Sequence, residues 1–162
     1  MPFAPLFDEI AESQIVEKIM VVVERDMKAA LDHFYAADNL PAFAVMTEGD
    51  QDVFSYPLLT LVVQEGASDE TVSGEYLDQQ IRVGAALAVS GSTIKDVRRK
   101  AKKYVRAFKA VVRKGVLELL PAASDYLDYS ISFRWRYLRH GTSGTTFTQA
   151  VEILIQIKFG ET

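Results

Sequence analysis

The sequence predicts a single α+β domain, residues 1–162, whose elements follow in the order α-β-β-α-β-β. Apolar residues recur every three or four positions over residues 8–37 and 93–114, and this spacing is typical of amphipathic helices. Three other stretches alternate apolar and polar side chains, as half-buried strands do, and a fourth is a nearly continuous apolar run. Because each helix has one apolar stripe to bury, we expect a mainly antiparallel sheet with both helices packed on one face.

The first helix is predicted over residues 8–37. Its charged residues lie on the faces away from the apolar stripe, so one side is suited to a core. Asn39 and Pro41 follow and predict the end of the helix, because a proline disfavours helical geometry in the residue before it. The stripe consists of Val16, Met20, Val23, Met27, Leu31 and Phe34.

Two strands are predicted between the helices, over residues 53–63 and 76–89. Pro57 has no amide hydrogen, so we expect it near the start of its strand or at an edge of the sheet. The intervening residues 64–75 are acidic and rich in glycine and serine, which predicts an exposed loop.

The second helix, predicted over residues 93–114, has clear signals at both ends. Thr93 and Asp96 have the spacing of a capping box, in which the hydroxyl accepts an early backbone amide hydrogen. Gly115 predicts the end of the helix. The face opposite its apolar stripe is basic. It carries Lys95, Arg98, Arg99, Lys102, Arg106, Lys109 and Arg113, widened by Lys100, Lys103 and Lys114.

A β-hairpin is predicted at the end of the chain, from strands over residues 129–137 and 147–159. Residues 139–146 between them are rich in glycine and threonine, which predicts a flexible loop. Aromatic residues alternate along the first strand, which is typical of a packed sheet face, although such residues also stack on bases in sheet-based RNA readers. The arginines that alternate with them, Arg134 and Arg136, would lie on the other face, where they could meet a partner.

Composition excludes several classes of protein. The chain has no cysteine, which excludes disulfides, zinc knuckles and thiol catalysis and is compatible with a reducing cytoplasm. Acidic residues near the N-terminus argue against a signal peptide, and no apolar stretch is long enough to predict a membrane span.

Charge is distributed very unevenly along the chain. Residues 1–81 contain 3 Lys/Arg and 16 Asp/Glu, a balance of −13, whereas residues 82–162 contain 15 Lys/Arg and 6 Asp/Glu, a balance of +9. Such a split indicates an interaction surface, although folding could also neutralise it within one molecule.

The sequence contains no catalytic or metal-binding motif that would indicate an enzyme. Its only histidines are His33, beside the first apolar stripe, and His140, in the hairpin loop without an obvious carboxylate partner. Acidic clusters such as Asp50 with Asp52 lack the spacing of a calcium loop. We therefore expect no enzymatic activity, no metal and no cofactor, and we rank a small-molecule or enzymatic domain last.

The basic helix face has three possible interpretations. It is a solvated surface, a site for nucleic-acid phosphates, or a surface that meets acidic residues of a neighbouring subunit. We favour the subunit contact, because the acidic half of the same chain supplies the complementary charge. Besides the seven basic helix residues, the candidate contact residues are Asp69, Glu70, Arg134, Arg136 and Arg139.

The sequence resembles the tail terminator and related head–tail joining proteins of long-tailed bacteriophages. The resemblance covers residues 10–159 and is carried by the order of the elements and by two segments. One is Tyr56-Pro57 followed by an apolar strand up to Val63, and the other is the closing strand over residues 147–157. The strongly basic second helix departs from the family pattern.

The resemblance implies a virion structural protein, assembled in the host cytoplasm, that forms a hexameric ring and acts without catalysis. Such a ring would cap the finished tail tube, and its partners would be other copies of itself, the tail tube protein and the head connector. DNA would pass through the central opening without being read. The nearest variant is a head-closure or neck protein of the same virion, and the remaining alternative is a nucleic-acid-binding module that uses the helix over residues 93–114.

Overall fold

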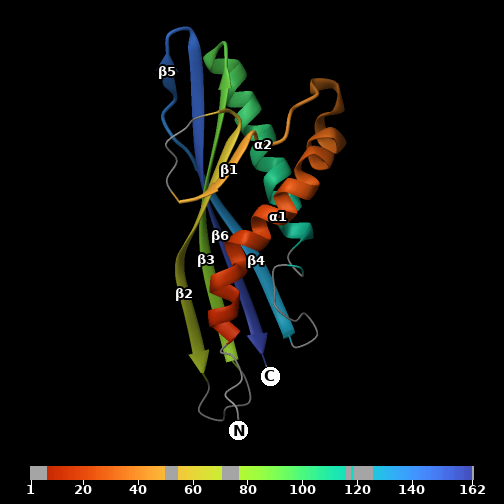
Figure 1. Ribbon diagram of the computed structural model, residues 1–162, viewed down its shortest axis with the longest axis vertical. Helices are drawn as coiled ribbons and strands as arrows, with labels where there is room; N and C mark the ends of the chain where they lie inside the picture. The colour runs from red at the N-terminus through yellow and green to blue at the C-terminus, as the bar shows by residue number, and fades with distance from the viewer. Residues whose placement is uncertain (1–6, 50–54, 71–76, 116–117, 119–125, 162) are drawn as a thin grey trace.

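A computed structural model describes residues 7–49, 55–70, 77–115, 118 and 126–161 of the chain. The described part contains two long helices and one six-stranded mixed sheet, so the α+β prediction is confirmed (Figure 1). In chain order the elements are α1 (Phe7–Tyr35), η1 (Ala36–Asp38), β1 (Val45–Glu48), β2 (Leu58–Glu70), β3 (Leu77–Gly91), α2 (Ile94–Lys114), β4 (Tyr126–Tyr137), β5 (Gly141–Ser143) and β6 (Thr146–Glu161).

The sheet is mainly antiparallel, as predicted. Its strand order is β1-β2-β3-β6-β4, and the short β5 also pairs with β6. Only β1 and β2 run parallel; the other described pairs are antiparallel. The two central strands, β3 and β6, pair along their whole length, from Leu77 opposite Glu161 to Gly91 opposite Phe147. This long strand pair forms the centre of the sheet.

Both helices pack on one face of the sheet (Figure 1). Alternate residues of the central strands, such as Val83, Leu87 and Ile155, are fully buried beneath them. Each such side chain stabilises the fold by about 1.5–3 kcal/mol through removal of apolar surface from water. The predicted layer arrangement is therefore confirmed.

Helix α1 ends slightly earlier than predicted. It stops at Tyr35, and a 3₁₀ turn then leads to Asn39, which has a left-handed backbone with φ of 46°. Asparagine tolerates this conformation better than most residues do. Lys28 fixes the turn, since its Nζ donates to Asn39 Oδ1 (3.1 Å) and to the Leu40 carbonyl (2.9 Å). The chain is thereby directed back to the sheet.

Helix α2 begins and ends as predicted. The Thr93 hydroxyl accepts a hydrogen bond from the Asp96 amide at 3.1 Å, and the Gly115 amide donates to the Val111 carbonyl at 3.0 Å. Glycine is needed at this end because a Cβ on Gly115 would lie 2.7 Å from Val22 Cγ1 of α1. In the buried stripe, the Tyr104 hydroxyl donates to the Pro41 carbonyl, and burial raises the pKa of Tyr104 to about 12.

The prediction of a loop over residues 64–75 is wrong for residues 64–70. Strand β2 continues through them, and after a register shift between Val63 and Glu65 it pairs with β3 as far as Glu70 opposite Leu77. Strand pairing uses backbone groups, so acidic and small side chains do not prevent it. Residues 71–75 of the predicted loop lie outside the described part.

Strand β1 is absent from the sequence-based prediction. It adds to β2 in parallel, with Val45 opposite Leu58, and the Ala44 amide donates to the Pro57 carbonyl at 2.7 Å. Pro57 directly precedes β2, as expected for a residue that lacks an amide donor. The predicted strand start is wrong, because residues 55–57 are not in a strand; residues 53–54 lie outside the described part.

The C-terminal hairpin is confirmed, but the loop predicted over residues 139–146 is partly ordered. Residues Gly141–Ser143 form β5, which pairs with β6 from Gly141 opposite Thr148 to Ser143 opposite Thr146. Gly144 allows the tight turn between them because its φ is +60°.

Candidate interaction surfaces

The basic face of α2 is divided into two parts by the structure. Its N-terminal part consists of four exposed cations, which we call the α2 basic stripe: Lys95, Arg98, Arg99 and Lys102. Within the described residues, none of the four forms an ion pair with a carboxylate. Their positive charge therefore faces solvent without a partner from the described part of the chain.

The C-terminal part of the same face rests on aromatic rings. The Arg106 guanidinium lies 4.3 Å from the ring centre of Phe34 in α1, and Lys109 Nζ lies 3.6 Å from that of Trp135 in β4. Burial lowers the pKa of Lys109, and the nearby Arg113 charge lowers it further. These cations thus already contact rings of their own molecule.

Two further cations, at the margin of the basic face of α2, also have partners within the molecule. Lys103 forms an ion pair with Asp38, which follows α1, and Lys100 Nζ donates to the Ser90 carbonyl at 2.8 Å. Among the described residues, Lys103 is the only α2 cation that pairs with a carboxylate of the acidic half. Among the described residues, folding therefore leaves the α2 basic stripe without a carboxylate partner in its own molecule.

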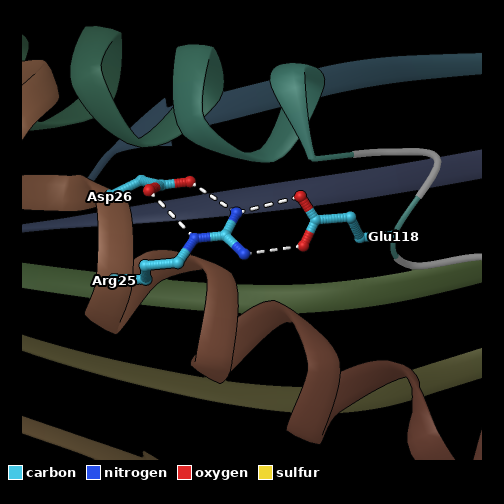
Figure 2. A network of polar contacts seen from close by, with 3 residues as sticks. All are labelled: Arg25, Asp26 and Glu118. Atoms are coloured by element: carbon cyan, nitrogen blue, oxygen red, sulfur yellow. Dashed lines mark hydrogen bonds and ion pairs between the residues drawn. The ribbon is translucent and has the colours of Figure 1, made fainter.

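A small polar network joins α1 to the segment after α2 (Figure 2). Arg25 Nη1 and Nη2 donate to the two Glu118 carboxylate oxygens at 2.8 and 2.9 Å, while its Nε and Nη2 donate to Asp26 at 3.0 and 2.8 Å. These hydrogen bonds lower the pKa of both carboxyls and raise the pKa of Arg25. The network is exposed, so it stabilises the contact between α1 and this segment only modestly.

Arg134 and Arg136 do not lie beside the α2 basic stripe. Their neighbours in β4, Phe133 and Trp135, contact α2 cations, so the alternating arginines project from the opposite face of the sheet. Arg136 forms an ion pair with Glu152, whereas Arg134 has no carboxylate partner among the described residues. The predicted contact residues therefore fall on two opposite faces.

The other three predicted contact residues belong to other segments of the chain. Arg139 is exposed in the connection between β4 and β5. The backbones of Asp69 and Glu70 belong to β2 and pair with Asp78 and Leu77 of β3, while their side chains lie outside the described part. They are in a strand, not in the loop that the sequence predicted.

The sheet face opposite the helices contains a shallow concavity of about 650 Å³ that sequence reasoning missed. No helix of the described part covers it. Small residues on β3 form its floor. Their occurrence at alternate positions of the strand, on one face, was the signal in the sequence that could have indicated the concavity. It is lined by Gly49, Thr60, Leu61, Val62, Gln64, Gly84, Ala85, Ala86, Arg134, Trp135, Arg136, Glu152, Ile153 and Leu154.

The described residues bring together no obvious catalytic centre. His33 is exposed at the end of α1 with its ring centre 5.1 Å from that of Phe34, and the ring centre of His140 lies 6.4 Å from that of Phe147. No group of three or more His, Asp or Glu residues in the described ranges is placed to hold a metal ion. Neither described helix is long and apolar enough to cross a membrane.

Comparison with known proteins adds no family assignment. Neither the protein-family models nor the curated protein sequences that were searched contain a match to this chain.

Proposed function

We propose that this protein is a non-enzymatic structural protein of a bacteriophage virion, a tail terminator whose ring caps the tail tube and joins it to the head connector. The observation that carries the proposal is the charge that folding leaves unpaired. The α2 basic stripe faces solvent, and on α1 the exposed Glu17 and Glu24 also lack ion-pair partners among the described residues.

Unlike charges on separate surfaces of one chain favour contacts between copies. A contact that joins two different surfaces is heterologous, and repeated heterologous contacts close into a ring when the rotation between copies permits. Complementary charge also steers the encounter and fixes the register of such contacts. These properties suit a protein that acts as a ring.

The order of elements supports the tail-terminator proposal. A long amphipathic helix, a central antiparallel pair, a second helix and a C-terminal hairpin follow one another as the resemblance implies. A head-closure or neck protein of the same virion is the nearest variant, since it would share both the ring and the partners.

Charge reversal on α2 tests the assembly part of the proposal. We expect wild-type protein to form a ring visible by negative-stain imaging, with a mass by light scattering that is a multiple of the monomer. Arg99→Glu combined with Lys102→Glu should weaken assembly, because two attractive contacts become repulsive. Lys114→Glu, a single charge reversal at the far end of the same helix, is a control outside the α2 basic stripe and should leave the ring intact.

A separate experiment tests the position in the virion. Wild-type rings should bind purified tail tubes at one end and stop their elongation, which imaging of tubes with and without the protein would show. Rings that assemble normally but ignore the tube would remove the terminator assignment and favour the neck variant. A strict monomer that ignores the tube would overturn both.

The α2 basic stripe also supports a second candidate function, binding of nucleic-acid phosphates. Four exposed cations at helical spacing form a positive surface that needs no sequence readout. Under this alternative, DNA affinity falls steeply with salt, with a log–log slope of roughly −0.9 for each phosphate contacted on duplex DNA. Arg99→Glu with Lys102→Glu would then abolish DNA binding without changing the mass of the protein in solution.

A further inference from the structure

The face of the sheet that lies away from α1 and α2 has an apolar centre in the described part. Such a face normally presents polar side chains to water. Here Val62 is 47% exposed, and Ala86 and Leu154 are half-buried. Together with Gly84 they lie at the centre of the concavity of about 650 Å³. This apolar centre is small and is rimmed by polar side chains, so a molecule that covers it would need both an apolar and a polar group.

Two adjacent cross-strand rows form this hollow. Each row runs across β2, β3, β6 and β4, and its residue on β3 is small, a glycine in one row and an alanine in the other. Gln64 folds over Gly84, since a Cβ there would meet its Nε2 at 2.3 Å. The rows are Val62–Gly84–Leu154–Arg134 and Thr60–Ala86–Glu152–Arg136.

The rim of the hollow carries a net positive charge at the β4 edge. Arg136 is neutralised by its ion pair with Glu152. Arg134 is exposed, lines the hollow and has no carboxylate partner among the described residues. An occupant with an apolar centre and a flanking carboxylate would therefore satisfy both features of this surface.

The outward face of α1 has that composition. Val21 is 55% exposed and is flanked by Glu17 one turn before it and Glu24 one turn after it. Of the nearby basic residues of α1, Arg25 pairs with Asp26 and Glu118 and Lys28 pairs with Asp32. Lys18 offsets one of the two carboxylates, so the face around Val21 keeps a net negative charge. The acidic charge around Val21 is thus available to a partner.

We infer that α1 of a second copy of this chain docks in the hollow, with Val21 against Ala86 and Leu154 and with Glu17 or Glu24 beside Arg134. This inference rests on the proposed self-assembly and names one contact within it, in which the α2 basic stripe takes no part. The dimensions agree: the stripe from Glu17 to Glu24 is about 10 Å long. A row across four strands spans about 14 Å.

The two surfaces lie on opposite sides of the same sheet, because α1 packs on the other face. Each copy therefore keeps one free α1 and one free hollow after a single contact. Repetition of the contact generates a ring or a chain rather than a closed dimer.

Cysteine cross-linking tests this contact directly, because the chain has no cysteine of its own. Full-length Val21→Cys and Ala86→Cys proteins are mixed and treated with a short bis-maleimide. We expect cross-linked dimers in the mixture and at most a trace with either protein alone. Ala29→Cys, exposed two turns further along α1, replaces Val21→Cys in the matched control and should give none.

Charge exchange provides a second measurement. Arg134→Glu should weaken assembly about tenfold, and Glu17→Arg together with Glu24→Arg should restore it, because the ion pair is then rebuilt in reverse. Arg139→Glu, an exposed arginine outside the hollow, should have no such effect. Circular dichroism of each variant confirms that it is folded.

The possible outcomes separate this contact from the assembly itself. Cross-linking in the mixture together with charge-exchange rescue establishes the contact. Multimers that form without cross-linking, or that ignore Arg134→Glu, overturn the contact but leave the proposed assembly standing. A protein that stays monomeric at every concentration overturns both.

Discussion

The two halves of α2 carry the same kind of residue at the same helical spacing, yet the structure treats them differently. In the C-terminal half, Arg106 and Lys109 lie over Phe34 and Trp135 of the same molecule. In the N-terminal half, Arg99 and Lys102 face solvent without ion-pair partners among the described residues. The basic face of α2 is therefore not one functional unit. Its C-terminal half is part of the fold, because the cations there contact aromatic rings of the same molecule.

The difference between the two halves follows from the position of α2 on the sheet. The C-terminal half crosses between α1 and β4, where exposed edges of aromatic residues are within reach. The N-terminal half begins beside the end of β3, where Lys100 donates a hydrogen bond to the Ser90 carbonyl. Cations that have no ring or carboxylate nearby keep their charge available for a partner.

Substitution in the buried apolar stripe, which both halves of α2 share, should cause the largest change in the free energy of unfolding. Phe108 is fully buried, so Phe108→Ala should lower the free energy of unfolding by about 3–5 kcal/mol. Lys102→Ala, on the exposed stripe, should change it by less than about 0.5 kcal/mol. Urea denaturation at a concentration where both proteins are monomeric measures the difference. Equal effects would mean that the exposed half is also part of the fold.

A double-mutant cycle sharpens the comparison between the halves. Lys109→Met and Trp135→Leu should be coupled by about 0.5–1 kcal/mol in the free energy of unfolding, because each removes the same cation–ring contact. The matched cycle of Lys102→Met with Trp135→Leu should show no coupling. Absence of coupling in the first cycle would contradict the assignment of Lys109 to the fold.

Loss of the Arg25 network should cause the smallest change in stability. That change can be recognised because it depends on pH. The pKa values of Asp26 and Glu118 are lowered by their hydrogen bonds to Arg25. Their contribution to stability is therefore present above the ordinary carboxylate pKa of about 4 and is lost as the pH falls through the lowered folded values.

Replacement of this arginine tests the network. Arg25→Gln should be slightly less stable than the wild type at neutral pH and equal to it in strong acid, as measured by thermal unfolding across that range. A difference that does not depend on pH would show that Arg25 acts through packing instead.

Local sequence signals predicted the helices well. Thr93 and Gly115 mark the ends of α2 by hydrogen bonds within a few residues, and such contacts depend little on the rest of the fold. Strand β1 and the extension of β2 depend on a partner strand that is distant in sequence. Short strands of mixed polarity such as Val45–Glu48 carry little periodicity of their own.

The candidate surfaces were predictable only in part. The basic face of α2 follows from helical spacing, and so its cations could be named from the sequence. Which of them would lie over Phe34, Phe133 or Trp135 depends on how α1 and β4 flank the helix, and no local pattern encodes that. The hollow around Gly84 likewise forms only when four strands pair in register.

The central claim is that copies of this chain assemble through unlike charges that folding leaves exposed. Its most direct test is the mass in solution, measured by sedimentation velocity at micromolar concentration from low to high salt. We expect a multimer at low salt whose mass falls toward 18.1 kDa as salt screens the contacts. A mass of 18.1 kDa at every salt and protein concentration would contradict the account.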